Sequence, residues 1–361
     1  MAKEVINVTK TFLPSIDEYK DILKESWEKN WITNRGSLIH KLEDKIKEYT
    51  GSCDFITMTN GTLPIQIALK TLDIKGEVIT TPFSYIATTS GILWENCTPV
   101  FVDIDPQYLT INEDFIESKI TKKTTAILAT HVFGNPCHIE KIEKIANKHD
   151  LHVIYDAAHC FGVKYKNKSI FNYGDISTCS FHATKIFHTG EGGALFSHKP
   201  EIIKKAFSLH NFGHNGPNLI ENIGINAKIS ELQAAMGLSV LPYMDKILEY
   251  RKKIIKCYLS KINFENTRTF KLRENTEWNF SYFPIILENE KAMLNLLKTF
   301  SENNIFPRRY FYPSLNKLNF LDETNCKISE NISSKIICLP LYHGLEMEKA
   351  DQICSIINDS V

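Results

Sequence analysis

The chain has 361 residues, 43% of them hydrophobic, which is too long for one small core and suits a large domain with a smaller one. Lysine plus arginine and aspartate plus glutamate both number 42, and this balance argues against a nucleic acid or an anionic membrane as partner. Nine cysteines without a Cys-x-x-Cys pair, no run of about 18 apolar residues and no signal-peptide pattern predict a cytoplasmic protein with reduced thiols and no metal site.

The first half of the chain alternates between helical and strand patterns. Amphipathic runs predict helices over residues 14–30 and 38–49, with a turn-rich break between them and Gly51 as the C-terminal cap of the second helix. Apolar runs then predict strands at 77–81, 100–104, 125–132, 152–155, 177–181 and 194–197, and helices at 85–94 and 139–150. This alternation predicts an α/β fold with a mostly parallel sheet covered on both faces.

The second half begins with two helical patterns, over residues 229–241 and 242–262. We place a domain boundary near residue 245, so that residues 1–245 form the large domain and residues 246–361 a small C-terminal α/β domain. Within the small domain we expect strands at 280–287 and 336–340 and helices at 291–303 and 346–358. Segment 308–313 is too polar for a core strand and ends at a proline, which indicates a loop that faces a ligand.

One lysine lies between two of the expected strands, where a ligand cleft is typical of open α/β sheets. Lys185 precedes a turn that contains Gly190, Gly192 and Gly193. A P-loop would need the lysine after the glycines, and a dinucleotide-binding fingerprint would need glycine where Leu195 stands. Two interpretations remain: an ordinary surface lysine, or a Schiff-base lysine that holds pyridoxal phosphate.

Two further segments are consistent with pyridoxal phosphate. Asp156 follows an apolar strand, where an aspartate can keep the ring nitrogen of the cofactor protonated, although a helix-capping aspartate is the alternative. Residues 59–62 read Thr-Asn-Gly-Thr and precede a helical run, so their amides and hydroxyl groups can bind a phosphate. An ordinary capped helix is the alternative for this second segment.

Together these motifs resemble the DegT/DnrJ/EryC1/StrS sugar aminotransferases. The matching segments occur in the family's order and extend over most of the chain, at residues 60–62, 85–88, 103–105, 131–134, 156–159, 180–185, 190–193 and 224–231. The resemblance implies a pyridoxal-phosphate enzyme of fold type I, like aspartate aminotransferase, with a seven-stranded, mostly parallel sheet in the large domain.

The resemblance also implies roles at the cofactor ring. Lys185 would be the catalytic lysine, and Asp156 would hold the ring nitrogen. His159, which stands where relatives often have glutamine, would donate a hydrogen bond to the ring oxygen. Tyr85 would stack on the ring, with Phe83 as the alternative stacking residue.

The resemblance implies a second group of residues, which would bind the cofactor phosphate. Gly61, Thr62 and Ser180 would bind it within one chain. Asn226 matches an asparagine that relatives supply from the neighbouring subunit, so the resemblance implies an obligatory homodimer with shared active sites. Lys228 stands where many relatives have arginine.

The resemblance implies six residues that bind the sugar substrate: Trp31, Arg35, His182, Arg308, Tyr310 and Tyr312. Arginine donors suit the diphosphate of a nucleotide-sugar. Asn316 stands where many relatives have histidine, which is a departure from the family pattern. The role of His188 stays open between substrate binding and a place in the pocket wall.

Residues 308–315 and 339–343 resemble the branch of the family that forms dTDP-4-amino-4,6-dideoxyglucose. The implied reaction moves an amino group from L-glutamate to C4 of dTDP-4-keto-6-deoxy-D-glucose, for O-antigen or related surface polysaccharides. The alternative is amination at C3 of a dTDP-3-keto-6-deoxyhexose. A dehydratase of the same fold would have histidine in place of Lys185, and a non-catalytic regulatory protein would normally carry a DNA-binding extension.

Overall fold

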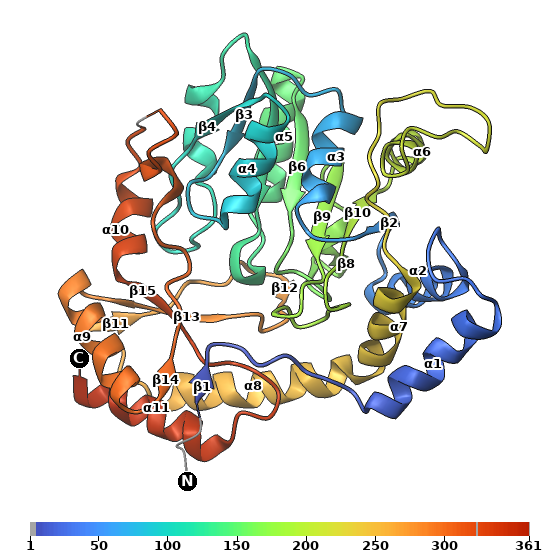
Figure 1. Ribbon diagram of the computed structural model, residues 1–361. Helices are drawn as coiled ribbons and strands as arrows, with labels where there is room; N and C mark the ends of the chain where they lie inside the picture. Colours follow the sequence, from blue (N-terminus) through green and yellow to red (C-terminus); the bar gives the residue numbers. More distant parts are fainter. Residues whose placement is uncertain (1–4, 323, 361) are drawn as a thin grey trace.

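A computed structural model describes residues 5–322 and 324–360, and a seven-stranded sheet lies at its centre (Figure 1). The strands follow the order β2-β10-β9-β6-β5-β3-β4. Strand β10 is antiparallel to both of its neighbours, and the other neighbouring pairs are parallel, which confirms the expected mostly parallel sheet. The bounds are β2 Asp54–Met58, β3 Glu77–Thr80, β4 Thr98–Phe101, β5 Thr124–Thr130, β6 His152–Asp156, β9 Ile176–Ser180 and β10 Gly193–Ser197.

Helices cover both faces of this sheet, because successive strand residues point to opposite sides. In β5, Ile127 and Ala129 pack in one core with helices α2, α5 and α7. Ala126 and Leu128 pack in a second core, on the other face, with helices α3, α4 and α6. The bounds are α2 Ser37–Thr50, α3 Leu63–Thr71, α4 Ile86–Trp94, α5 Ile139–His149, α6 Pro200–Leu209 and α7 Glu231–Val240.

A second lobe is built around the long helix α8 (Met244–Lys261), which runs along one side of the molecule away from α7 (Figure 1). Its three-stranded sheet has the order β11-β13-β15 and packs with helices α9 and α11 in a separate core. The bounds are β11 Thr267–Arg268, β13 Phe283–Leu287, β15 Ile336–Leu339, α9 Glu290–Glu302 and α11 Met347–Ser360. The division of the chain at residue 245 stays a prediction.

Shorter elements join the two lobes. Strand β1 (Ile6–Asn7) pairs with β14 (Ile305–Phe306), so the N-terminal segment lies against the second lobe before helix α1 (Ile16–Glu28) reaches α7. Strand β12 (Thr276–Glu277) pairs with β7 (Lys164–Tyr165), which pairs with β8 (Lys168–Ser169). Helix α10 (Lys327–Lys335) contacts α9. In the described part of the chain, no helix has both the length and the apolar character that crossing a bilayer requires.

Candidate active site

Ten of the expected site residues line one cavity of about 260 Å³ at an edge of the central sheet. Strands β5, β6 and β9 are parallel and end at this edge, where Asp156 and Ser180 are the last residues of β6 and β9. The ten residues are Gly61, Thr62, Tyr85, Asp156, His159, Ser180, His182, Lys185, Arg308 and Tyr310. The cavity therefore has the location that ligand sites take in open α/β sheets.

Lys185 lies in the loop that connects β9 to the antiparallel strand β10. Its backbone N–H donates to the carbonyl of His182 at 2.8 Å, and Ala183 N donates to the carbonyl of Gly190 at 2.7 Å. Gly190 has φ of 80°, which an L-residue rarely adopts. Desolvation lowers the pKa of Lys185 below that of an ordinary lysine, and the nearby Tyr310 and Asp156 oppose this shift. The free amine is therefore more readily deprotonated than a surface lysine.

Asp156 is buried, with two hydrogen bonds to its carboxylate. The hydroxyl of Thr88 in α4 donates to Oδ2 at 2.6 Å, and the N–H of Ala158 donates to Oδ1 at 3.0 Å. Burial raises the pKa of Asp156, while the two hydrogen bonds and the charge of Lys185 act in the opposite direction. A cationic group placed against this carboxylate would further favour its charged form.

His159 follows β6 and is held in one tautomer by the backbone. Its Nδ1 accepts a hydrogen bond from the N–H of Phe133 at 3.1 Å, so the neutral ring carries its proton on Nε2. Burial lowers the pKa of His159 well below the usual value, and the charge of Lys185 acts in the same direction. His159 is therefore a neutral donor in the cavity wall.

The segment before α3 and the end of β9 approach each other closely. A Cβ atom on Gly61 would lie 2.6 Å from Cβ and 2.7 Å from Oγ of Ser180, so this contact requires glycine. Asn60 Oδ1 accepts from the N–H groups of Thr62 and Leu63, both at 2.9 Å. The hydroxyl of Thr62 has no partner among the described residues. Helix-start amides and hydroxyls in this arrangement can bind a phosphate.

The two candidates for the stacking residue differ in their surroundings. Tyr85 lines the cavity and is 59% exposed, whereas Phe83 is completely buried and packs edge-on against Phe133 and Phe311. Of the two, Tyr85 is the residue that a ligand in the cavity can contact, so the structure favours Tyr85 over Phe83 for stacking.

The outer wall of the cavity carries the groups that suit a polar substrate. His182 Nε2 lies 3.5 Å from the carboxylate of Glu191, and both side chains line the cavity. Arg308 lies over the ring of Tyr310, 5.3 Å from its centroid, and forms no ion pair with another described residue. This guanidinium is available to an anionic ligand.

Four of the expected site residues lie away from the cavity in the single chain. Arg35 forms a bidentate ion pair with Glu43 (2.9 and 2.6 Å), and Tyr312 stacks with Arg309, whose guanidinium carbon lies 3.4 Å from the ring centroid. The other two, Trp31 and Asn226, are exposed, and the side chain of Asn226 has no hydrogen-bond partner in the described residues. Their roles stay predictions.

Two further polar residues have structural partners. His188 is buried; its Nε2 donates to the carbonyl of Phe12 at 2.7 Å, and its Nδ1 accepts from the N–H of Gly190 at 3.2 Å. Asn316 is buried as well, and its amide donates to the carboxylate of Glu330 at 2.7 Å. His188 therefore connects the loop that contains Lys185 to Phe12, and it does not line the cavity.

Some residues of the site could not be assigned a role from the sequence. Thr88 supports the cavity through its bond to Asp156, and its place in the Tyr85–Thr88 motif was an indication of such a role. Tyr282 offers no such indication, because it follows a polar segment of the second lobe. The other wall residues without an individual role assigned from the sequence are Asn60, Ile65, Ala87, Thr130, Ala158, Thr184, Glu191 and Phe311.

These residues fit pyridoxal phosphate. Gly61, Thr62 and Ser180 offer a narrow anion site in contact with a helix start, and Asp156 offers a buried carboxylate for the ring nitrogen. Lys185 lines the same cavity with an amine of lowered pKa. In residues 5–322 and 324–360, no group of three His, Cys, Asp or Glu side chains could hold a metal ion.

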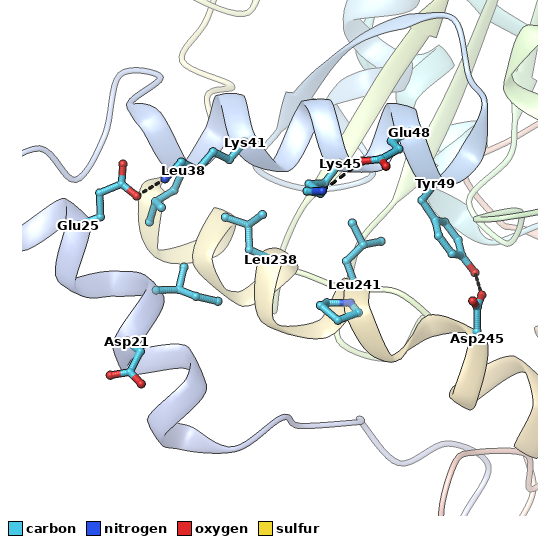
Figure 2. Close-up of a pocket in the computed structure, with 12 residues that line it drawn as sticks. Asp21, Glu25, Leu38, Lys41, Lys45, Glu48, Tyr49, Leu238, Leu241 and Asp245 are labelled. Carbon is cyan, nitrogen blue, oxygen red and sulfur yellow. Dashed lines mark hydrogen bonds and ion pairs between the residues drawn. The ribbon is translucent and has the colours of Figure 1, made fainter.

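A larger cavity, of about 870 Å³, lies between α1, α2 and α7 (Figure 2). Its floor is apolar, with Leu38, Leu238 and Leu241, and its rim contains charged groups that pair with one another. Figure 2 shows the pairs Glu25–Lys41, Lys45–Glu48 and Tyr49–Asp245. It contains none of the expected site residues, and its paired charges offer no reactive group, so the smaller cavity is the candidate active site.

Curated relatives resemble this chain along its whole length. The dTDP-4-amino-4,6-dideoxy-D-glucose transaminase of Shigella dysenteriae is 39% identical over 364 residues, which cover 98% of each chain. The enzyme of the same name from Escherichia coli is 35% identical, and the match covers 99% of each chain. The GDP-perosamine synthase of Vibrio cholerae is 30% identical over 96% of this chain and 97% of its own.

Solved structures share the fold at lower identity. DesI, crystallised in the presence of its TDP-sugar product, has a TM-score of 0.93 and 23% identity, and the match covers 99% of this chain and 93% of that chain. The PLP form of the putative sugar aminotransferase Spr1654 from Streptococcus pneumoniae has a TM-score of 0.89 and 22% identity, over 98% and 99%. These matches confirm the expected fold type I. The model of the DegT/DnrJ/EryC1/StrS aminotransferase family matches residues 15–358, so the chain belongs to this family.

Proposed function

We propose that this aminotransferase moves an amino group from L-glutamate to C4 of dTDP-4-keto-6-deoxy-D-glucose and forms dTDP-4-amino-4,6-dideoxy-D-glucose. The observation that carries the proposal is one cavity in which Lys185, Asp156 and the Gly61–Ser180 contact come together. The two relatives with 39% and 35% identity are both named for this product. Their names favour amination at C4 over the C3 alternative.

Pyridoxal phosphate is the cofactor of this family, and when bound it supplies the electron sink through which the amino group passes between the two substrates. The protein's task is to hold and move protons. In the first half-reaction, Lys185 Nζ takes the proton from the α-carbon of the amino donor. In the second half-reaction, it delivers a proton to C4 of the sugar. The lowered pKa of Lys185 favours the neutral amine that the first transfer requires.

Asp156 and His159 would keep the cofactor ring in one electronic state. The carboxylate of Asp156 would accept a hydrogen bond from the protonated ring nitrogen of the cofactor. Thr88 and Ala158 N already orient its two oxygen atoms. Nε2 of neutral His159 would donate toward the ring oxygen, since its Nδ1 is committed to Phe133 N. The hydrogen bonds that orient Asp156 and His159 for these two contacts are already present in the protein without the cofactor.

The nucleotide-sugar would enter from the side of Arg308 and Tyr310. The guanidinium of Arg308 has no ion-pair partner among the described residues and suits the diphosphate. The His182–Glu191 pair provides one donor and one acceptor for the sugar hydroxyl groups. The product would serve O-antigen or related surface glycans, and we expect the enzyme in the cytoplasm.

The second subunit of a homodimer would complete the site. The exposed apolar residues of the described chain include Trp31 (52%), Tyr85 (59%) and Ile223 (87%), and a partner subunit would cover such surface. Asn226 lies in the same loop region as Ile223, with a side chain free to reach a partner's phosphate site. Trp31 would join the neighbouring site in the same way, whereas Arg35 would first have to leave its ion pair with Glu43.

The test combines recombinant protein, pyridoxal phosphate, L-glutamate and dTDP-4-keto-6-deoxy-D-glucose, and measures the product by mass and by NMR. We expect the product to have the mass of the amino-sugar nucleotide, and we expect NMR to show the nitrogen on C4. Nitrogen on C3 after incubation with the 3-keto isomer, with no reaction of the 4-keto sugar, would overturn the assignment. Parallel reactions with aspartate and alanine identify the donor, and a Lys185→Ala preparation is the control.

A further inference from the structure

A short segment of the second lobe, residues 279–282, crosses to the active site and is fixed there. The side chain of Asn279 donates to two carbonyls of the large lobe, His159 O at 2.8 Å and Phe161 O at 3.0 Å. The side-chain oxygen Oδ1 of Asn279 accepts from Ser281 N at 3.2 Å. Phe280 has φ of 56°, a left-handed conformation that is unfavourable for phenylalanine unless the surroundings hold it.

A buried arginine holds the same segment from the other side. Arg251, in α8, donates from Nε to the carbonyl of Phe280 at 2.8 Å and from Nη2 to the carbonyl of Ser281. Arg251 is only 5% exposed and has no carboxylate partner among the described residues. Burying a guanidinium without a carboxylate partner costs free energy. The two backbone contacts of Arg251 offset part of this cost and fix the position of residues 280 and 281.

The segment places the ring of Tyr282 against the catalytic lysine. Lys185 Nζ lies over this ring, 5.8 Å from its centroid, within the range of a cation–π contact. The Tyr282 ring also packs on the ring of His159, with centroids 4.8 Å apart, and edge-on against Tyr310 at 5.4 Å. The Tyr282 ring is thus in contact with Lys185, His159 and Tyr310 at once.

We propose that Tyr282 is a positioning residue for the catalytic lysine. Its ring, fixed across the two lobes by Arg251 and Asn279, holds the amine of Lys185 against one wall of the cavity whenever that amine is not bonded to the cofactor. The lysine then returns to the same place after each proton transfer. The inference rests on the proposed function only in taking Lys185 as the lysine that binds the cofactor.

Other titratable groups also face Lys185, and the test has to separate Tyr282 from them. They come from five parts of the chain: Tyr85 before α4, Asp156 at the end of β6 with His159 just after it, Cys179 on β9, His182 and Glu191 in the lysine loop, and Tyr310 in the second lobe. A substitution at residue 282 leaves all of them in place. The ring of Tyr282 favours the charged amine, so its removal lowers the pKa of Lys185, whereas loosening of the site would admit water and raise it.

The experiment measures how fast full-length protein, stripped of cofactor, binds pyridoxal phosphate through Lys185 at a series of pH values. Borohydride reduction and peptide mapping verify that Lys185 carries the pyridoxyl label. We expect Tyr282→Phe to keep the wild-type pH midpoint and Tyr282→Leu to shift it to lower pH. In steady-state assays, Tyr282→Leu should lower kcat about tenfold while KM for the nucleotide-sugar changes little.

Phe280→Leu is the matched control, because it removes a ring from the same segment that packs on Trp278 and does not line the cavity. We expect its midpoint to equal that of the wild type. Arg251→Lys should shift the midpoint when Tyr282 is present and leave it unchanged in a Tyr282→Leu background. If Tyr282→Leu does not fold, Tyr282→Met provides the same comparison.

An unchanged or raised midpoint in Tyr282→Leu, or equal shifts in the Phe and Leu variants, would overturn the inference while the proposed function stands. A pyridoxyl label on a different lysine would instead overturn the proposed function. The two failures are thus distinguishable in one set of measurements.

Discussion

Thr88 is the residue on which the charge of Asp156 depends most directly. Its hydroxyl donates to Asp156 Oδ2 at 2.6 Å, and burial would otherwise favour the neutral acid. A hydrogen bond to a charged group contributes roughly 1.5–3 kcal/mol, so we expect Thr88→Val to lower kcat by about tenfold or more. Thr88→Ser keeps the hydroxyl and should stay close to the wild type. Equal kcat values for the Val and Ser variants would contradict this role.

His131 gives the protein a pH-dependent stability that is unrelated to catalysis. It is buried, its Nδ1 accepts from Cys137 N at 3.0 Å, and burial lowers its pKa to about 3. The unfolded chain binds this proton near pH 6.5 and the folded protein does not, so the free energy of unfolding falls as the pH falls from 6.5 toward 3.

His131→Asn keeps an acceptor for Cys137 N and removes the titrating group. Between pH 5.5 and 4, the wild type should lose stability more steeply than this variant, by roughly 1.4 kcal/mol per pH unit. Urea unfolding at several pH values measures the difference. Parallel curves for the wild type and His131→Asn would show that His131 is protonated in the folded state.

Among the elements, helix α10 is capped at its N-terminus by a carboxylate from the other lobe. Asp103 follows β4, and its two oxygen atoms accept from Ile328 N and Ser329 N, both at 2.8 Å. Loss of a helix-capping carboxylate typically costs about 0.5–2 kcal/mol, so Asp103→Ala should lower Tm measurably. Asp103→Asn retains one acceptor and should lose less. Because Asp103 does not line the cavity, cofactor affinity should not change in either variant; a large change would place α10 in the site.

The elements also show which parts of the fold the sequence can predict. The cavity residues of strand ends, such as Asp156 and Ser180, were predictable because a local motif identifies both the residue and its strand. Strand β4 was expected two residues too late, since Asp103 and Asp105 form turns at the end of the apolar run. Strand β2 was not predicted, because its five residues are partly exposed at the start and show no clear alternation of apolar and polar side chains.

Residues that act across lobes could not be predicted from local patterns. Arg251 lies on an ordinary helical face in the sequence, and only the fold places its guanidinium against the carbonyls of Phe280 and Ser281. The same holds for Glu231, whose carboxylate accepts from Leu38 N at 2.8 Å at the start of α2. Strand β13 begins at Phe283 and not at residue 280, because these contacts hold residues 279–282 outside the sheet.

For the whole molecule, shared active sites predict a specific pattern of complementation. If Asn226 serves the partner's site, a heterodimer of Lys185→Ala and Asn226→Asp chains has one site with both lesions and one intact site. Mixing the two inactive proteins should then restore part of the activity. The interface of such an obligate dimer is typically larger than about 2,000 Å².

The matched control mixes Lys185→Ala with Asp156→Asn. Both residues line the same cavity in one chain, so every site of that heterodimer keeps one lesion and no activity should return. Subunit exchange is verified by mass spectrometry in both mixtures. If the first mixture stays inactive although exchange is complete, Asn226 acts within its own subunit.

The order of the central sheet also has a consequence for synthesis on the ribosome. Strand β2 is at the edge of the central sheet and pairs within that sheet with β10, although 134 residues of chain lie between Met58 and Gly193. Strand β2 therefore has no partner in the central sheet until residue 197 has emerged. Nascent chains that stop before β10 should fail to capture the cofactor, even though the other five strands are already complete.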